Sequence, residues 1–167
     1  MRTLIFPVCN TDISRLITEL HDPTLKKRRS AALHLGKSGN LSAVLPLVAA
    51  LSDIHPIVRC EIAQALGRLG DPSAVAGLIV CLDDPNVDVR ASAIAALGKI
   101  KDRDAVDPLI GCLCDREIII RIGAAEVLGK LGDRRAIEPL KNLGHDPFSD
   151  VRDAAAAALR KLRLRSR

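Results

Sequence analysis

Apolar side chains recur at helical spacing along the chain, and the same arrangement returns every 31 residues. In the stretch from Asp84 to Cys114, four apolar residues fall on one stripe of a helix, namely Val89, Ala93, Ile94 and Leu97. One period earlier, the same stripe consists of Val58, Ile62, Ala63 and Leu66. A fixed period of this length predicts a solenoid, in which each unit buries its apolar face only against its neighbours.

Three residue types mark the period. Arginine recurs at Arg28, Arg59, Arg90, Arg121 and Arg152. Leucine recurs at Leu35, Leu66, Leu97, Leu128 and Leu159. In four repeats a glycine follows this leucine, at Gly36, Gly67, Gly98 and Gly129. A glycine at this place predicts that the backbones of neighbouring helices approach each other closely.

Each repeat is predicted to contain two helices. The first helix begins after a residue that favours the N-cap position, which is Asn40, Asp71, Asp102 or Asp133. In the first repeat, this helix corresponds to the segment from Asp12 to His21. Proline inside a helix predicts a bend, and it occurs here at Pro46, Pro108 and Pro139.

The second helix is predicted to begin directly after an aspartate, which is Asp22, Asp53, Asp84, Asp115 or Asp146. Proline, the favoured first helical residue, follows three of them as Pro23, Pro85 and Pro147. The helix closes near a glycine that fits a C-cap, at Gly39, Gly70 and Gly132, and Lys101 takes this place in one repeat. The result is an all-α fold of ten helices in five pairs, with no segment left for a strand.

The repeats are expected to form a single solenoid domain over residues 12–163. Residues 1–11 precede the first period, and their apolar side chains are Leu4, Ile5, Phe6 and Val8. We expect this segment to cover the first helix as a cap, which a terminal repeat needs. Residues 164–167 are assigned to a basic C-terminal tail.

Composition supports helices and limits the choice of partner. Two Phe and no Trp or Tyr leave aliphatic residues to build the core, which suits helix packing better than a sheet sandwich. The net charge of +5 comes from residues 160–167, and without their five basic residues the chain has 20 basic and 20 acidic side chains. A neutral body argues against nucleic acid as the main partner, because that affinity depends on many phosphate contacts.

Cysteine usage and hydropathy bear on the compartment. The five cysteines are odd in number and show no disulfide spacing, which favours a reducing environment. Cys81 and Cys112 lie one period apart and are predicted to be small core residues. The N-terminal MRTLIFPV is too short for a signal peptide, and no apolar run approaches membrane-spanning length. We therefore expect a soluble, cytoplasmic protein with no membrane partner.

Two segments resemble a known family, DPNVDVRASAIAALGKIKDRDAVDPLI and VRCEIAQALGRLGDPSAVAGLI. Their interior proline, inter-helix aspartate and Val-Arg pair are similar to HEAT repeats of the short, regular kind found in phycobiliprotein lyases. The resemblance covers residues 12–163 and implies a right-handed α–α superhelix of five HEAT-like helix pairs. It also implies that the second helices line the concave face, which is the usual partner-binding surface.

The repeated arginine allows two interpretations. Helix-capping aspartates recur in the same register as the arginines, so we expect a hydrogen-bond ladder from each guanidinium to an aspartate of its own or the adjacent repeat. The alternative is that the five arginines bind phosphates.

The face of the second helix opposite its core stripe is the candidate binding surface. It holds the residues two before the repeated arginine and two, five and nine after it. The candidate residues at these positions are Ile57, Glu61, Gln64, Arg68, Asp88, Ser92, Ala95, Lys99, Ile119, Glu126 and Lys130, and we add Ile122, which directly follows its arginine.

The last of these positions is basic in all five repeats, beginning with Lys37. One interpretation is a solvated rim, since a basic residue near a helix C-terminus is favoured by the macrodipole. The other is the basic edge of a groove, in which Ile57, Ile119 and Ile122 anchor a partner helix over a floor of small residues.

Catalytic chemistry is not indicated. The four histidines share no register, and Cys112 and Cys114 lack the second cysteine pair of a zinc site. Neither a phosphate-binding glycine loop nor a Ser/His/Asp arrangement is present. We therefore assign no catalytic residues, no metal ligands and no cofactor.

The function predicted from these features is a non-catalytic scaffold that binds another protein on its concave face. A preformed surface of this kind orders little on binding and so loses little entropy. Two alternatives stay open. The resemblance implies a phycobiliprotein chromophore lyase or a lyase-like subunit, in which the basic positions would meet the bilin propionates. The other alternative is nucleic-acid binding through the basic positions and the tail.

Overall fold

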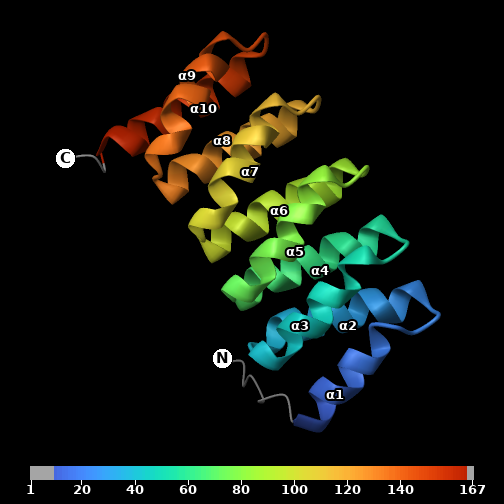
Figure 1. Cartoon of the computed structure of the whole chain (residues 1–167). Coiled ribbons are helices and arrows are strands. Elements are labelled where there is room, and N and C mark those ends of the chain that lie inside the picture. Colours follow the sequence, from blue (N-terminus) through green and yellow to red (C-terminus); the bar gives the residue numbers. More distant parts are fainter. Residues whose placement is uncertain (1–9, 165–167) are drawn as a thin grey trace, which may run out of the picture.

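The protein is a stack of helix pairs, seen in a computed structural model that describes residues 10–164 (Figure 1). Within these residues there are ten α-helices and no strand, which confirms the predicted all-α solenoid. The predicted N-terminal cap formed by Leu4, Ile5, Phe6 and Val8 lies outside the described residues, as do residues 165–167 of the predicted tail.

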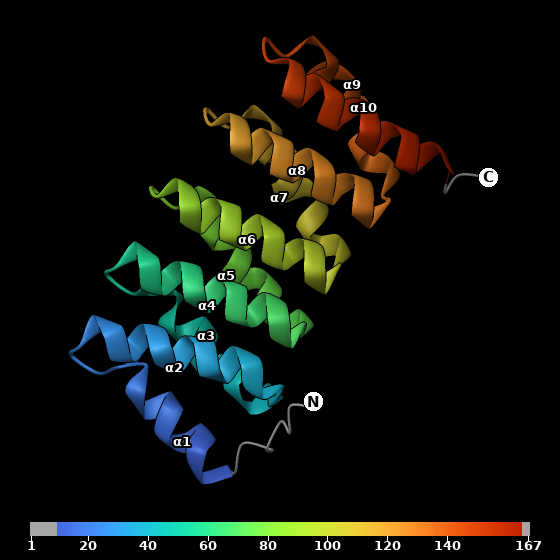
Figure 2. The same ribbon diagram turned by 180° about the vertical axis from the view of Figure 1, so that it is seen from behind.

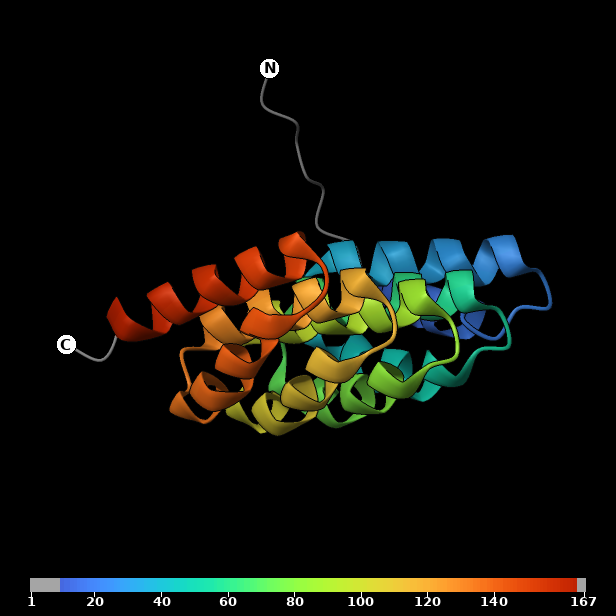
Figure 3. The same ribbon diagram turned by 90° about the horizontal axis from the view of Figure 1, so that it is seen from above.

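The helices form two layers (Figures 1 and 3). The first helices of the five pairs are α1 (Asn10–Glu19), α3 (Val44–Ala49), α5 (Val75–Val80), α7 (Val106–Gly111) and α9 (Ile137–Asn142). The second helices are α2 (Leu25–Ser38), α4 (Pro56–Leu69), α6 (Val87–Ile100), α8 (Ile118–Leu131) and α10 (Ser149–Leu164). Figure 2 shows the second helices side by side, each against the second helix of the next pair.

The later first helices are short because a 3₁₀ turn comes before and after each α segment. The predicted N-caps begin the leading turns. The side-chain oxygens of Asn40, Asp71, Asp102 and Asp133 each accept the amide hydrogen of the residue two places further on. Pro46, Pro108 and Pro139 each stand third in their α segment, directly after the change from 3₁₀ to α geometry.

The predicted start of the second helices is wrong by two residues. These helices begin three residues after the aspartate, and Pro23, Pro85 and Pro147 lie in the connecting turn. The aspartate instead closes an Asx turn, as at Asp53, whose carboxylate accepts the His55 amide hydrogen at 2.8 Å. The same carboxylate also binds an arginine, as described below, and the N-cap position is taken by the residue directly before the helix, which is His55 for α4.

The ends of the second helices follow the prediction. Gly39, Gly70 and Gly132 close three of them with left-handed backbones at φ 69°, 73° and 78°. Lys101 closes α6 at the corresponding place with φ 62° and is the only non-glycine residue with positive φ in the described part of the chain.

Glycine–alanine contacts hold the second helices close together. A Cβ atom added to Gly36 would lie 2.6 Å from the Ala65 Cα, and one added to Gly67 would lie 2.8 Å from the Ala96 Cα. On the other layer, an open crevice of about 690 Å³ lies between α3 and α5, lined in part by Val48 and Val80. Each second helix contacts the second helix of the next pair along the whole stack, and we call this layer the inner layer.

Candidate partner-binding face

A ladder of arginines and aspartates joins successive repeats at the turns between their two helices. Arg59 donates from Nε and Nη2 to the two carboxylate oxygens of Asp84 at 2.7 and 2.8 Å. Its Nη1 donates to the main-chain oxygen of Asp53 at 2.7 Å. Equivalent bidentate pairs are Arg28–Asp53, Arg90–Asp115 and Arg121–Asp146. Each guanidinium thus spans two repeats, and its fork is occupied by protein acceptors rather than being open to a phosphate.

The last arginine of the series has no aspartate partner among the described residues. Arg152 donates from Nη1 to the main-chain oxygens of Asp146 and Pro147 at 2.7 and 3.0 Å, and its side chain is exposed.

The ladder keeps its carboxylates ionised. Burial raises the pKa of Asp53, but hydrogen bonds from Arg28 and from the His55 amide outweigh burial and leave the pKa below its usual value. The same balance lowers the pKa values of Asp84 and Asp115. For Asp146, the hydrogen bond from Arg121 is the largest effect and lowers its pKa.

The predicted binding face lies on the layer of second helices, on the solvent-facing sides of α4, α6 and α8. Most of the candidate residues are exposed there, namely Ile57, Gln64, Arg68, Asp88, Ala95, Lys99, Ile119, Glu126 and Lys130. Ser92 is half-buried. Ile57 and Ile119 expose 44% and 63% of their surface, so both can contact a partner.

Two of the candidate residues are more buried than the others. Glu61 is buried and forms ion pairs with Arg68 at 3.3 Å and with Arg29 of α2 at 3.6 Å. Ile122 is half-buried and packs against the core, because it follows the ladder arginine directly and so turns toward the neighbouring helix. The role of Ile122 as an anchor stays a prediction.

A shallow groove of about 460 Å³ runs between α4 and α6 on this face. Its lining brings together the candidate residues Ile57, Gln64, Asp88 and Ser92. Residues directly after the ladder arginines also line it, at Cys60 and Ala91. The sequence reasoning missed that position, although the four-residue spacing from Cys60 to Gln64 places both on one helix side.

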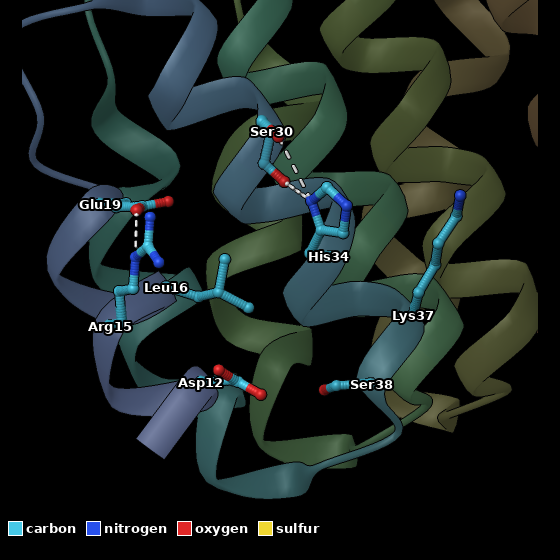
Figure 4. Close-up of a pocket in the computed structure, with 8 residues that line it drawn as sticks. All are labelled: Asp12, Arg15, Leu16, Glu19, Ser30, His34, Lys37 and Ser38. Atoms are coloured by element: carbon cyan, nitrogen blue, oxygen red, sulfur yellow. Dashed lines mark hydrogen bonds and ion pairs between the residues drawn. The ribbon is translucent and has the colours of Figure 1, made fainter. Parts of the chain in front are cut away.

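A second hollow, of about 440 Å³, lies at the N-terminal end of the stack between α1 and α2 (Figure 4). Several of its polar groups are paired with each other. Arg15 Nε lies 2.9 Å from Glu19 Oε1, and His34 Nδ1 lies 2.7 Å from the Ser30 main-chain oxygen. Lys37 stands at its rim. No sequence pattern indicated this hollow, because it depends on how α1 lies against α2.

The buried cysteines are part of the core. Burial is the main cause that raises the pKa values of Cys81 and Cys112 to about 11. Both thiols are therefore protonated at neutral pH, which does not suit a nucleophile. In residues 10–164, no group of three or more His, Cys, Asp or Glu side chains is placed to hold a metal ion. None of the described helices is long and apolar enough to cross a membrane.

Comparison with known families agrees with this architecture. The sequence model for HEAT repeats matches residues 13–86 and 75–160. The chain belongs to the HEAT-repeat family. Among curated protein sequences, none matches it.

Solved structures extend the likeness of this HEAT-repeat chain. It is 32% identical to a chain in the complex of CpcE and CpcF of phycocyanin lyase from Nostoc sp. PCC7120, with a TM-score of 0.79, covering 95% of this chain and 68% of that one. A designed armadillo repeat protein in complex with the peptide (KR)4 has a TM-score of 0.73 at 19% identity, covering 91% and 82% of the two chains. An engineered protein has a TM-score of 0.69 at 20% identity, covering 92% and 80%. The last two show the fold alone.

Proposed function

We propose that this protein is a non-catalytic scaffold that binds a helical segment of a partner protein on the inner face formed by α4, α6 and α8. The observation that carries this proposal is the exposure of Ile57 and Ile119 on a face whose floor consists of small or half-buried side chains. An isoleucine in the open costs hydration free energy that a partner's apolar side chain would recover.

The supporting structure is rigid where the partner would bind. The ladder and the glycine–alanine contacts fix neighbouring second helices relative to one another. A surface fixed before binding gives up little conformational entropy when a partner docks, so modest contact energy suffices for useful affinity.

The test compares two matched pairs of substitutions. Ile57→Asp with Ile119→Asp places two charges on the inner face, whereas Leu45→Asp with Val80→Asp places two on the first-helix layer. All four residues are exposed, so helicity and melting temperature should stay close to wild type. Affinity capture followed by mass spectrometry should show a set of proteins that the inner-face variant loses and the control retains. Equal capture by the two variants would refute the proposal.

A second candidate function is a phycobiliprotein lyase or a lyase-like subunit. It is favoured by the 32% identity to the CpcE–CpcF complex of phycocyanin lyase, which extends over 95% of the chain. In this case the partner would be a phycobiliprotein or a second lyase subunit. Mixing the protein with phycocyanin, with and without its bilin, tests this directly. A change in the bilin absorption spectrum or transfer of the bilin is expected, and unchanged spectra without binding would exclude it.

We also propose the cytoplasm as the compartment. Cys60, Cys81, Cys112 and Cys114 are free thiols, as a reducing environment favours.

A further inference from the structure

One row of basic residues crosses the whole inner layer. It consists of Lys37, Arg68, Lys99, Lys130 and Lys161, one from each second helix. We call it the basic row. All five side chains are exposed, although the rest of the described chain has a near balance of acidic and basic residues.

Two side chains of the row lie over the seams between helices. Arg68 Nη1 comes within 3.1 Å of the point where Gly36 would carry a Cβ atom. Lys99 Cδ comes within 3.5 Å of the corresponding point at Gly67. The two glycines thus leave room for the neighbouring helix and also for the basic side chain that leans across it.

The positive charge of the row is only partly balanced. Arg68 pairs with Glu61 at 3.3 Å, whereas Lys37, Lys99 and Lys161 form no ion pair with any described residue. A helix C-terminus contributes about half a negative charge, less than the whole charge of a lysine. The helix C-termini therefore do not neutralise the basic row, and its net positive charge remains available to a ligand.

The opposite border of the same face includes exposed apolar side chains. There the residues two before the ladder arginines include Ile57 and Ile119, both exposed. Eleven residues separate each of these positions from the basic row, which at 1.5 Å per residue is roughly 16 Å along the helix. A helix with its side chains is about 10–12 Å wide, so one helix laid along the stack covers most of this width and contacts both borders when their side chains lean inward.

We propose that the partner segment is an amphipathic helix with one acidic flank and one apolar flank, laid along the stack so that its carboxylates meet the basic row. This inference rests on the proposed scaffold function and specifies its partner. Packed helices are about 8–10 Å apart, and seven residues of a helix rise about 10.5 Å. The carboxylates therefore recur about every seventh residue, and three to four steps of the stack require about 21–28 residues of partner helix.

The binding probe is a 25-residue helical peptide with glutamate at every seventh position and leucine on the adjoining flank. Its matched control carries glutamine in place of glutamate. Fluorescence anisotropy should show that the glutamate peptide binds at least tenfold more tightly, and that this advantage shrinks as salt rises.

Matched protein variants locate the site. Lys37→Gln/Lys99→Gln/Lys161→Gln should lose about tenfold in affinity for the glutamate peptide. Arg116→Gln/Arg134→Gln/Lys141→Gln removes the same charge from connecting turns and the first-helix layer and should bind like wild type. Equal losses in the two triple variants would overturn the proposal, because attraction would then follow net charge alone.

Two further outcomes separate this inference from the function on which it rests. If Ile57→Asp/Ile119→Asp abolishes binding but the glutamine peptide binds as well as the glutamate peptide, the scaffold function stands and the acidic partner is refuted. Tighter binding of a twelve-nucleotide single-stranded oligothymidylate than of the glutamate peptide would also refute it, in favour of nucleic acid.

Discussion

Arg90 and Asp115 lie 25 residues apart in the sequence and form a bidentate ion pair in the fold. Arg90 Nε donates to Asp115 Oδ2 at 2.9 Å, and Nη2 donates to Oδ1 at 3.0 Å. The Arg90 side chain exposes 6% of its surface and the Asp115 side chain 15%. Arg90 Nη1 also donates to the Asp84 main-chain oxygen at 2.9 Å, so a single side chain fastens two consecutive inter-helix turns.

Removal of this arginine should destabilise the stack strongly. Arg90→Ala leaves the Asp115 carboxylate buried without its partner, a change that typically costs about 3–5 kcal/mol. Arg152→Ala is the matched control, because Arg152 occupies the same register but is exposed and has no aspartate partner in the described part of the chain. Its cost should be about 1 kcal/mol or less. Urea unfolding monitored by circular dichroism gives both values, and similar midpoints for the two variants would contradict the assigned role of the ladder.

Acid should weaken the ladder in a defined pH range. The pKa values of Asp53, Asp84, Asp115 and Asp146 are lowered in the folded protein. A lowered folded-state pKa contributes stability that is fully present above the unfolded value of about 3.9 and is lost as the pH falls through the folded value. The melting temperature should therefore be nearly constant from pH 7 to pH 5 and should fall steeply below pH 4. The difference in melting temperature between wild type and Arg90→Ala should become smaller over the same pH range. A constant difference would argue against this linkage between protonation and stability.

Close helix packing makes the repeated glycine sensitive to a single methyl group. A Cβ atom at Gly67 would lie 2.8 Å from the Ala96 Cα and 2.9 Å from its Cβ, and neither atom can rotate away. Gly67→Ala should therefore cost about 1–3 kcal/mol. At Gly111, also helical, no atom lies within 4 Å of the added Cβ, so Gly111→Ala should be neutral or should stabilise by up to about 1 kcal/mol. Thermal unfolding measures the melting temperature of both variants. Equal shifts in melting temperature would show that helix propensity, rather than the contact with Ala96, determines the effect.

The repeat period was sufficient to predict the fold, because each helix packs mainly on its sequence neighbours. Gly67 is an example, since its recurrence every 31 residues indicated close packing before the contact with Ala96 was seen. The start of the second helices was not predictable in the same way. The sequence shows that Asp53 precedes a helix, but not that its carboxylate is shared between an Asx turn and Arg28 of the preceding repeat.

The candidate face was predicted in outline but not in detail. Exposure of Ile57 and Ile119 follows from helical spacing. The orientation of Glu61 and Ile122 does not, because it depends on the neighbouring repeat. Arg29 of α2 reaches Glu61 and helps to bury it, and Ile122 fills space against the core. The burial of a side chain at the border between two helices is therefore the hardest to predict from the periodicity of one helix alone.

Lys101 offers a chance to stabilise the protein. It has φ 62° at the end of α6, where an L side chain is strained by about 1–2 kcal/mol, whereas glycine occupies the equivalent place after α2, α4 and α8. Lys101→Gly should raise the unfolding free energy by up to about 1 kcal/mol, less than the relieved strain because glycine gains more freedom in the unfolded chain. Lys99→Gly, two residues earlier within the helix, should instead cost about 1 kcal/mol. Opposite shifts in melting temperature are expected, and a loss in both variants would count against strain at Lys101.

At both ends of the stack, polar residues occupy the register positions at which, between repeats, small or apolar residues make the contacts of neighbouring second helices. Gly36, Gly67, Gly98 and Gly129 each receive a residue of the next second helix, but their equivalent in α10 is Arg160, which is exposed. The residues that pack on those glycines are Ala65, Ala96, Val127 and Ala158, and their equivalent in α2 is His34, also exposed. The buried Val58 likewise has Lys27 as its equivalent in α2.

These replacements should prevent head-to-tail association, because a large charged side chain at Arg160 occupies the space that a following helix needs. A variant with Arg160→Gly, His34→Ala and Lys27→Val restores the joining residues at both ends, and the two ends then complement each other as a heterologous interface that does not close. Its mass by light scattering should rise with concentration, whereas the wild type should stay monomeric. The variant with Arg160→Gly alone keeps the polar N-terminal end and should also stay monomeric. A wild-type protein that already forms concentration-dependent chains, or a triple variant that does not, would show that the ends are not closed by these side chains.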